Sequence, residues 1–182
     1  FNLQHYPHLP DSVRQSLQRT IEQLGQELSQ LEEDIETFLK RHTHLDDEQR
    51  LLRSIRGVGA NSAPPFLVLL HRFRAITAGK GTAKQLVAFL GLDPAPYQSG
   101  CSVHRPSSIS KKGDKMGRAL LYMAALGGVS GHNALRSFYR ALVERGKPKK
   151  VALVASARKI LVWAWAVFYS RTPFTAVPQP IT

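Results

Sequence analysis

A mainly α-helical fold is predicted by three features of this 182-residue sequence. Apolar residues recur at alternating spacings of four and three between Leu17 and Phe38, the repeat of a helix that buries a narrow stripe. The segments 63–70 and 151–169 are apolar over lengths that suit buried helices. We find no convincing series of alternating segments that would indicate strands.

The N-terminal helix is predicted over residues 11–41, after a proline-containing linker at 1–10, with Asp11 and Ser12 as its cap. Its heptad stripe consists of Leu17, Ile21, Leu24, Leu28, Leu31, Ile35 and Phe38. This regularity favours a coiled coil, whose partner helix could come from this chain, from a preceding part of the protein or from a second copy. An ordinary amphipathic helix packed on its own domain is the alternative.

A helix-hairpin-helix element is predicted around Ile55–Gly59, between a helix over 49–56 and an apolar segment that starts at Ala63. Gly57 and Gly59 would allow a tight turn, and the amides that open the second helix would face a phosphate. Pro64 and Pro65 fit the first turn of that helix. A purely structural turn is the alternative.

Further helices are predicted at 82–90, with Thr82 as N-cap, at 115–127, at 134–145 before Gly146, and at 151–169. We expect the helix over 115–127 to be buried through Leu120, Leu121, Met123, Ala124 and Leu126. These elements define a domain over 45–174, followed by a tail at 175–182.

The charge is strongly positive, with 25 Lys and Arg against 13 Asp and Glu, a net +12 and a pI near 10.3. After Arg50 the only acids are Asp93, Asp114 and Glu144. This imbalance favours nucleic acid as the partner over an anionic membrane. Because Cys101 is the only cysteine, we expect no disulfide framework and no thiolate zinc site, which fits a cytoplasmic protein.

The most unusual segment is 97–113, where five serines lie among basic residues and Gly100, Pro106 and Gly113 favour loop structure. Acids are too few after Arg50 for a two-metal nuclease, and no zinc pattern, P-loop or dinucleotide fingerprint is found. A hydroxyl nucleophile in a cationic cradle remains, and Ser99 before Gly100 is the best candidate. A flexible basic surface loop, with serines that cap the backbone, is the alternative.

Six ordered blocks then give the chain a family resemblance. They read Ile-Arg-Gly-Val-Gly at 55–59, Ala-Lys-Gln-Leu-Val-Ala-Phe-Leu-Gly-Leu-Asp-Pro at 83–94, Tyr-Gln-Ser-Gly at 97–100, Ile-Ser-Lys-Lys-Gly at 109–113, Arg-Ala-Leu-Leu-Tyr-Met-Ala-Ala at 118–125 and Arg-Gly-Lys-Pro-Lys-Lys-Val-Ala-Leu-Val-Ala at 145–155. Over about residues 45–174 the chain resembles the C-terminal half of the Piv/MooV-like insertion-sequence transposases, the bridge-RNA-guided recombinases of the IS-one-ten type.

The resemblance implies that Ser99 becomes covalently linked to DNA. It also implies a composite site with an N-terminal RuvC-like domain, whose four acids hold Mg²⁺; residues 1–50 do not supply those acids. We therefore expect no cofactor in this chain, double-stranded DNA and a bridge RNA as partners, and a dimer or tetramer formed through the coiled coil. We expect a prokaryotic, nucleoid-associated location and no membrane partner.

The residues predicted to contact nucleic acid are Gly57, Gly59, Arg105, Ser110, Lys111, Lys112, Arg118, Lys147, Lys149 and Lys150. A function of another class is a non-catalytic helix-hairpin-helix module for DNA binding and oligomerisation. A structural coiled-coil assembly protein is a third.

Overall fold

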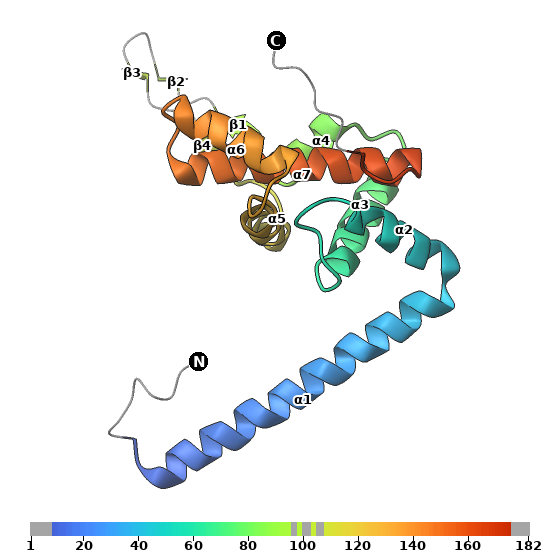
Figure 1. The fold of residues 1–182 in the computed structure, drawn as a ribbon, viewed down its shortest axis with the longest axis vertical. Coiled ribbons are helices and arrows are strands. Elements are labelled where there is room, and N and C mark those ends of the chain that lie inside the picture. Colours follow the sequence, from blue (N-terminus) through green and yellow to red (C-terminus); the bar gives the residue numbers. More distant parts are fainter. Residues whose placement is uncertain (1–8, 96–97, 100–102, 105–107, 176–182) are drawn as a thin grey trace. The chain divides into compact units, whose positions relative to one another are not determined.

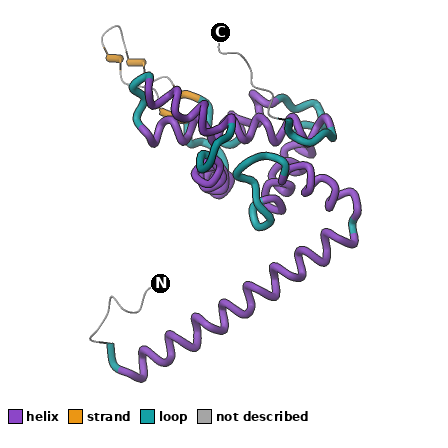
Figure 2. Tube along the Cα trace, viewed as in Figure 1, coloured by secondary structure: helices purple, strands orange, loops and turns teal. Residues whose placement is uncertain are grey.

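The computed structural model describes residues 9–95, 98–99, 103–104 and 108–175. The chain divides into two compact units, Phe1–Thr43 and His44–Thr182, and each is described by itself. Its elements are α1 (Asp11–Arg41), α2 (Thr43–Arg53), α3 (Ala63–Ile76), α4 (Ala83–Phe89), β1 (Pro94–Ala95), β2 (Gln98–Ser99), β3 (Val103–His104), β4 (Ser108–Ile109), α5 (Lys115–Gly128), α6 (Ala134–Glu144) and α7 (Lys149–Ser170) (Figure 1). The fold of the described residues is mainly α, as predicted (Figure 2).

Helix α1 leaves its apolar stripe exposed. Leu24, Leu28 and Leu31 each keep more than half of their surface in contact with solvent, at 58%, 59% and 59%. The polar faces are joined by contacts between residues four apart, such as the 2.9 Å hydrogen bond from Gln18 Nε2 to Glu22 Oε1. The predicted cap is wrong, because Asp11 already lies in the helix and Pro10, at the N-cap, makes no side-chain cap bond.

Helix α7 is the centre of the second unit and packs against α4, α5 and α6. By length and composition alone it could cross a membrane, yet 56% of its apolar stretch is buried inside the fold. Trp165 and Phe168 are nearly inaccessible, and the Trp165 ring meets Phe73 of α3 edge-on, with ring centroids 5.2 Å apart. The apolar character of α7 is therefore accounted for by the core that it forms with its neighbours.

Helix α5 is buried along one face only, which corrects the predicted burial of its whole length. Leu121 and Ala124 are inaccessible, whereas Met123 is 63% exposed and Leu126 48% exposed. With 3.6 residues per turn, Leu121 and Ala124 share one side of the helix and Met123 projects from the other. The sequence does not distinguish the buried face of α5 from its exposed face, because both faces are apolar.

Helix α4 begins with the cap that the sequence predicts. Thr82 Oγ1 accepts a hydrogen bond from the Gln85 amide, and the Gln85 side chain accepts one from the Thr82 amide. This capping box satisfies two amides that the first turn would otherwise leave unpaired. Leu86, Val87 and Leu90 then face the core, which orients α4 against the rest of the second unit.

Candidate nucleic-acid interface

The glycine turn at 55–59 lies between α2 and α3, as the hairpin prediction requires, and several amides at this turn and just after it already have acceptors within the chain. The Gly59 N–H donates to Ser62 Oγ at 2.8 Å. At the start of α3, the Ala63 N–H donates to Gly59 O and Phe66 N–H to Ser62 O. Pro64 and Pro65, which do lie in the first turn, have no N–H to offer. These amides and prolines therefore offer no free N–H to a phosphate, while the predicted nucleic-acid contacts of Gly57 and Gly59 stay a prediction.

Gly57 instead forms a packing contact. Its φ is +99°, and a side chain there would collide with the backbone oxygen of Ala124 and lie 3.0 Å from Gly128 Cα. The turn thus rests backbone to backbone on the last turns of α5. At Gly59, by contrast, an added Cβ would meet no atom within 4 Å.

The serine-rich segment carries two short antiparallel ladders rather than being loop throughout. Strand β1 pairs with β4, with Ala95 opposite Ser108. Strand β2 pairs with β3, with Gln98 opposite His104 and Ser99 opposite Val103. Two residues separate the ladders on one side and three on the other, so the register shifts by one residue between them.

Ser99 is the last residue of β2, and three residues connect it to β3. Arg105, the first predicted cation of this segment, lies outside the described residues, as does Gly100. The backbone pairing thus places Ser99 at the end of a ladder, next to the connection between its two strands.

The base of this segment, residues 110–113, is joined by hydrogen bonds to residues 91–93, which follow α4. Ser110 Oγ donates to Asp93 Oδ1 at 2.5 Å, and the Ser110 and Lys111 amides donate to Asp93 O and Gly91 O. Gly91, at φ +66°, lies so close to residues 111–113 that an added Cβ would be 2.8 Å from the Lys112 nitrogen. Ser110, predicted to contact nucleic acid, is therefore held by Asp93.

Arg118 also makes hydrogen bonds within the fold. Its Nη1 donates to Leu90 O at 3.0 Å and to Gly113 O at 2.8 Å, so it joins the end of α4 to the segment that leads into α5. Lys111 and Lys112, on the same segment, are exposed. Lys111 has a φ of +56°, a left-handed conformation that is strained for a side chain of this size. The structure thus groups Ser110, Lys111, Lys112 and Arg118 at one place.

Lys147, Lys149 and Lys150 lie at the connection between α6 and α7 and are exposed. Lys149 and Lys150 occupy the first turn of α7, where the helix dipole is positive, so their charges are unfavourable there without a nearby anion. Within the described part of the chain, no ion pair joins these lysines to an acid.

The positive charge is concentrated in the second unit. Residues 44–182 contain 21 Lys and Arg against 6 Asp and Glu, a formal +15, whereas residues 1–43 contain 4 against 7, a formal −3. A polyanion would therefore be attracted to the second unit. Among the described residues, no group of three or more His, Cys, Asp or Glu is placed to hold a metal ion.

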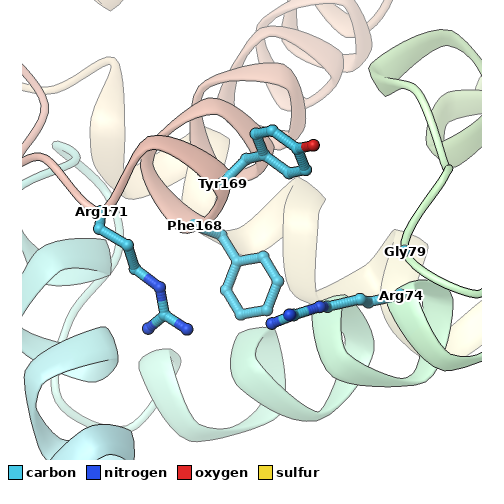
Figure 3. Close-up of a pocket in the computed structure, with 5 residues that line it drawn as sticks. All are labelled: Arg74, Gly79, Phe168, Tyr169 and Arg171. Atoms are coloured by element: carbon cyan, nitrogen blue, oxygen red, sulfur yellow. The ribbon is translucent and has the colours of Figure 1, made fainter.

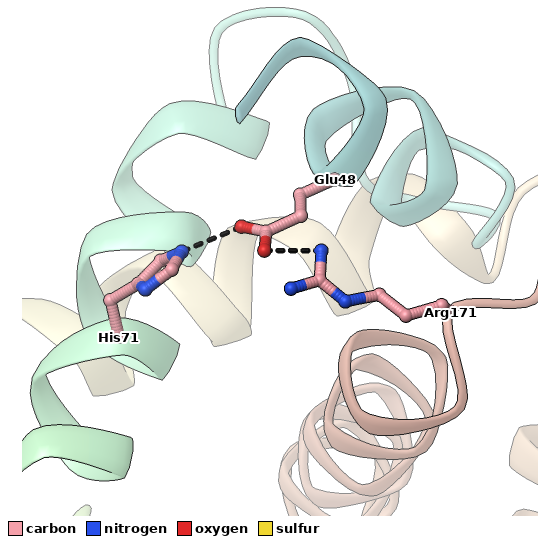
Figure 4. A network of polar contacts seen from close by, with 3 residues as sticks. All are labelled: Glu48, His71 and Arg171. Carbon is pink, nitrogen blue, oxygen red and sulfur yellow. Dashed lines mark hydrogen bonds and ion pairs between the residues drawn. The ribbon is translucent and has the colours of Figure 1, made fainter. Parts of the chain in front are cut away.

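A buried polar cluster was not predicted. Glu48 of α2, 2% exposed, lies with Oε2 2.6 Å from His71 Nε2 of α3 (Figure 4). Its other oxygen forms an ion pair with Nη1 of Arg171. The cluster joins α2, α3 and the end of α7. In the sequence Glu48 follows Asp46 and Asp47 on a polar helix, so no local signal marks it as buried.

Comparison with known proteins places these features in a family. The model of the transposase family IS116/IS110/IS902 matches residues 49–140. Pilin gene-inverting proteins are similar to this chain: that of Moraxella bovis is 33% identical over 150 residues, 81% of this chain and 45% of its own length. That of Moraxella lacunata is 31% identical over 148 residues, with the same shares.

An insertion element IS110 protein of Streptomyces coelicolor is 28% identical over 153 residues, which cover 82% of this chain and 35% of that protein. The chain thus spans less than half the length of these relatives. Since the family model covers half of the chain, the chain belongs to the IS116/IS110/IS902 family of transposases.

Proposed function

We propose that this chain is part of a DNA transposase or recombinase and binds double-stranded DNA through its second unit. Family membership supports the proposal, and relatives named for inverting a pilin gene point to rearrangement of DNA. The formal charge of +15 on residues 44–182 suits a polyanionic substrate.

Ser99 is the proposed nucleophile. Its Oγ would attack the phosphorus of a phosphodiester, form a phosphoserine ester and displace a sugar hydroxyl, which leaves with the proton. Reversal by another strand's hydroxyl would rejoin DNA and free the serine. The observation that supports this assignment is that residues 110–113, at the base of the serine-rich segment, are held in place and carry exposed positive charge. There Asp93, Gly91 and Arg118 hold the backbone, and the exposed Lys111 and Lys112 would offer charge to the phosphoryl oxygens.

A guide RNA and Mg²⁺ complete the proposal. The RNA would specify the DNA sites, and Mg²⁺ would belong to a RuvC-like domain in the rest of the protein. The described residues hold no group of three or more His, Cys, Asp or Glu that fits such an ion.

Ser99→Ala in the full-length protein is expected to abolish strand joining while DNA binding stays within about twofold. The reason is that the variant removes one hydroxyl and no charge. The measurement is a suicide substrate with a nick near the cleavage site, on which the wild-type protein should form a covalent adduct that maps to Ser99.

Ser108→Ala is the matched control, since Ser108 lies exposed on β4 of the same segment. It should retain the adduct. Normal joining by Ser99→Ala would remove Ser99 from this role. Specific DNA binding by the wild type without any adduct would instead favour the non-catalytic helix-hairpin-helix module.

We further propose that α1 pairs with a second copy through its exposed stripe. Burying Leu24 and Leu31 is worth about 1.5–3 kcal/mol each. Leu24→Lys with Leu31→Lys should therefore shift the protein to monomer in sedimentation equilibrium. Gln26→Lys with Gln30→Lys adds the same charge on polar faces and should leave the assembly unchanged. Equal masses for the two double variants would exclude pairing through this stripe.

A further inference from the structure

A small pocket lies where α3 and α7 end, outside the residues assigned above. Its volume is about 260 Å³, and it is lined by Arg74, Gly79, Phe168, Tyr169 and Arg171 (Figure 3). Ligand pockets for drug-sized molecules measure about 300–1,000 Å³, so this one suits a smaller group.

Two guanidinium groups converge in this pocket. The Cζ atoms of Arg74 and Arg171 lie 6.0 Å and 5.6 Å from the centre of the Phe168 ring, and Figure 3 shows both side chains extending beside that ring toward the same space. Cation–π contact with Phe168 holds each group but does not neutralise it.

Arg171 is held there against a conformational cost. It caps α7 with φ +57° and ψ +27°, a left-handed conformation that usually belongs to glycine at helix ends. An arginine in this conformation requires compensation, and the ion pair with the buried Glu48 supplies part of it. Glu48 is therefore a positioning residue for the pocket.

The charges in the pocket do not balance. Glu48 pairs with Arg171, whereas Arg74 makes no ion pair with an acid in the described parts of the chain. Guanidinium groups bind phosphate and carboxylate oxygens through paired N–H donors. An anion with several oxygens in the pocket would give Arg74 the partner that it lacks and would accept from the N–H groups of Arg171 that Glu48 leaves unused.

Tyr169 adds an aromatic surface beside this anion site. It is 69% exposed and lies at the rim of the pocket, with its ring 6.0 Å from that of Trp165. An exposed ring beside a phosphate site suits a nucleotide base that follows the phosphate along a strand. This arrangement, together with the charge of +15 on the second unit, favours a nucleic acid over an acidic peptide.

We propose that Arg74 and Arg171 bind one backbone phosphate of a nucleic-acid strand and that Tyr169 stacks on a neighbouring unpaired base. Tyr169 lies 19 positions after Lys150 on α7, about 28 Å along the axis at about 1.5 Å per residue. The pocket is therefore a second contact point, at the other end of the helix from the lysines. The proposal rests on the proposed function, because it assumes that this unit binds nucleic acid.

The test compares Arg74→Gln with Arg72→Gln in the full chain. Arg72 lies on the same helix, is also exposed and has its guanidinium 5.9 Å from Phe89 rather than in the pocket. Affinity is measured across a salt series for three probes of equal length: duplex DNA, single-stranded DNA and a structured RNA. Arg74→Gln should weaken binding about tenfold to the probe that occupies the pocket and reduce the salt slope by about 0.7–0.9, with a smaller effect for Arg72→Gln.

The three probes distinguish the sources of the phosphate. Tyr169→Ala should weaken single-stranded DNA or RNA with unpaired bases by about tenfold and leave the duplex nearly unchanged. Equal affinities and slopes for Arg74→Gln and Arg72→Gln on all probes would overturn the pocket while leaving the proposed function intact. A wild-type chain that bound none of the probes would overturn both. Thermal unfolding of each variant keeps a folding defect from being counted as lost binding.

Discussion

Gly57→Ala should destabilise the second unit by about 3 kcal/mol, through strain at positive φ and overpacking against α5. The added methyl group would collide with the Ala124 backbone oxygen, and Gly128 Cα lies 3.0 Å away on the same surface. Neither neighbour is a flexible side chain that could swing aside. Urea unfolding followed by circular dichroism measures the change, which corresponds to a fall of about 6–12 °C in the melting temperature of a chain of this size.

Gly59→Ala is the control within the same motif. Its Cβ would meet no atom within 4 Å, so its stability should change by less than about 0.5 kcal/mol. The two variants distinguish two roles of the glycine turn. If the turn serves packing, only Gly57→Ala should lower the free energy of unfolding. If it serves phosphate binding alone, neither variant should lower it. If Gly57→Ala were as stable as Gly59→Ala, the inference that Gly57 packs closely against the backbone of α5 would be wrong.

Glu48→Gln should cost about 2 kcal/mol of unfolding free energy. Removing one member of a buried ion pair leaves its partners without compensation and costs about 3–5 kcal/mol when all members are buried. Here the His71 and Arg171 side chains are 39% and 48% exposed, so water can compensate in part and the expected value is lower. Urea unfolding at low and at high salt measures it.

Asp46→Asn is the matched control on the same helix. Asp46 pairs with Arg50 at 2.7 Å, but the Arg50 side chain is 71% exposed, so the change should be below about 0.5 kcal/mol and vanish in high salt. The loss in Glu48→Gln should persist, because its carboxylate is shielded from ions. A loss that disappeared in high salt would show that the Glu48 cluster acts like a surface pair.

Periodicity and turn chemistry carried most of the helix prediction. The stripe of α1, the capping box at Thr82 and the stop at Gly146 are local signals, and each appears where the sequence indicates. The burial of α5 was not local. Met123 and Leu121 are both apolar, and only the packing of other parts of the second unit, α7 among them, against one face of α5 makes them differ.

The candidate site likewise has features that local sequence signals indicate and others that depend on packing. The family blocks single out Ser99, and the predictions that it is the nucleophile and that α1 forms a coiled coil remain predictions. The amide of Gly59 donates to Ser62, three positions further on, and two prolines in the first turn of α3 have no N–H, so the phosphate contact predicted at this turn has fewer donors than expected and stays a prediction. Arg118, expected in a cradle, holds two backbone oxygens.

A basic, mainly helical member of a transposase family can therefore be recognised without the fold, because charge, periodicity and ordered motifs are properties of the linear chain. Which charges are paired depends on how the helices pack. Glu48, His71 and Arg171 are separated by up to 123 positions along the chain and meet in a buried cluster. Arg74 lies three residues from His71, yet among the described residues it pairs with no acid, since a guanidinium's partner depends on which distant helix end packs beside it.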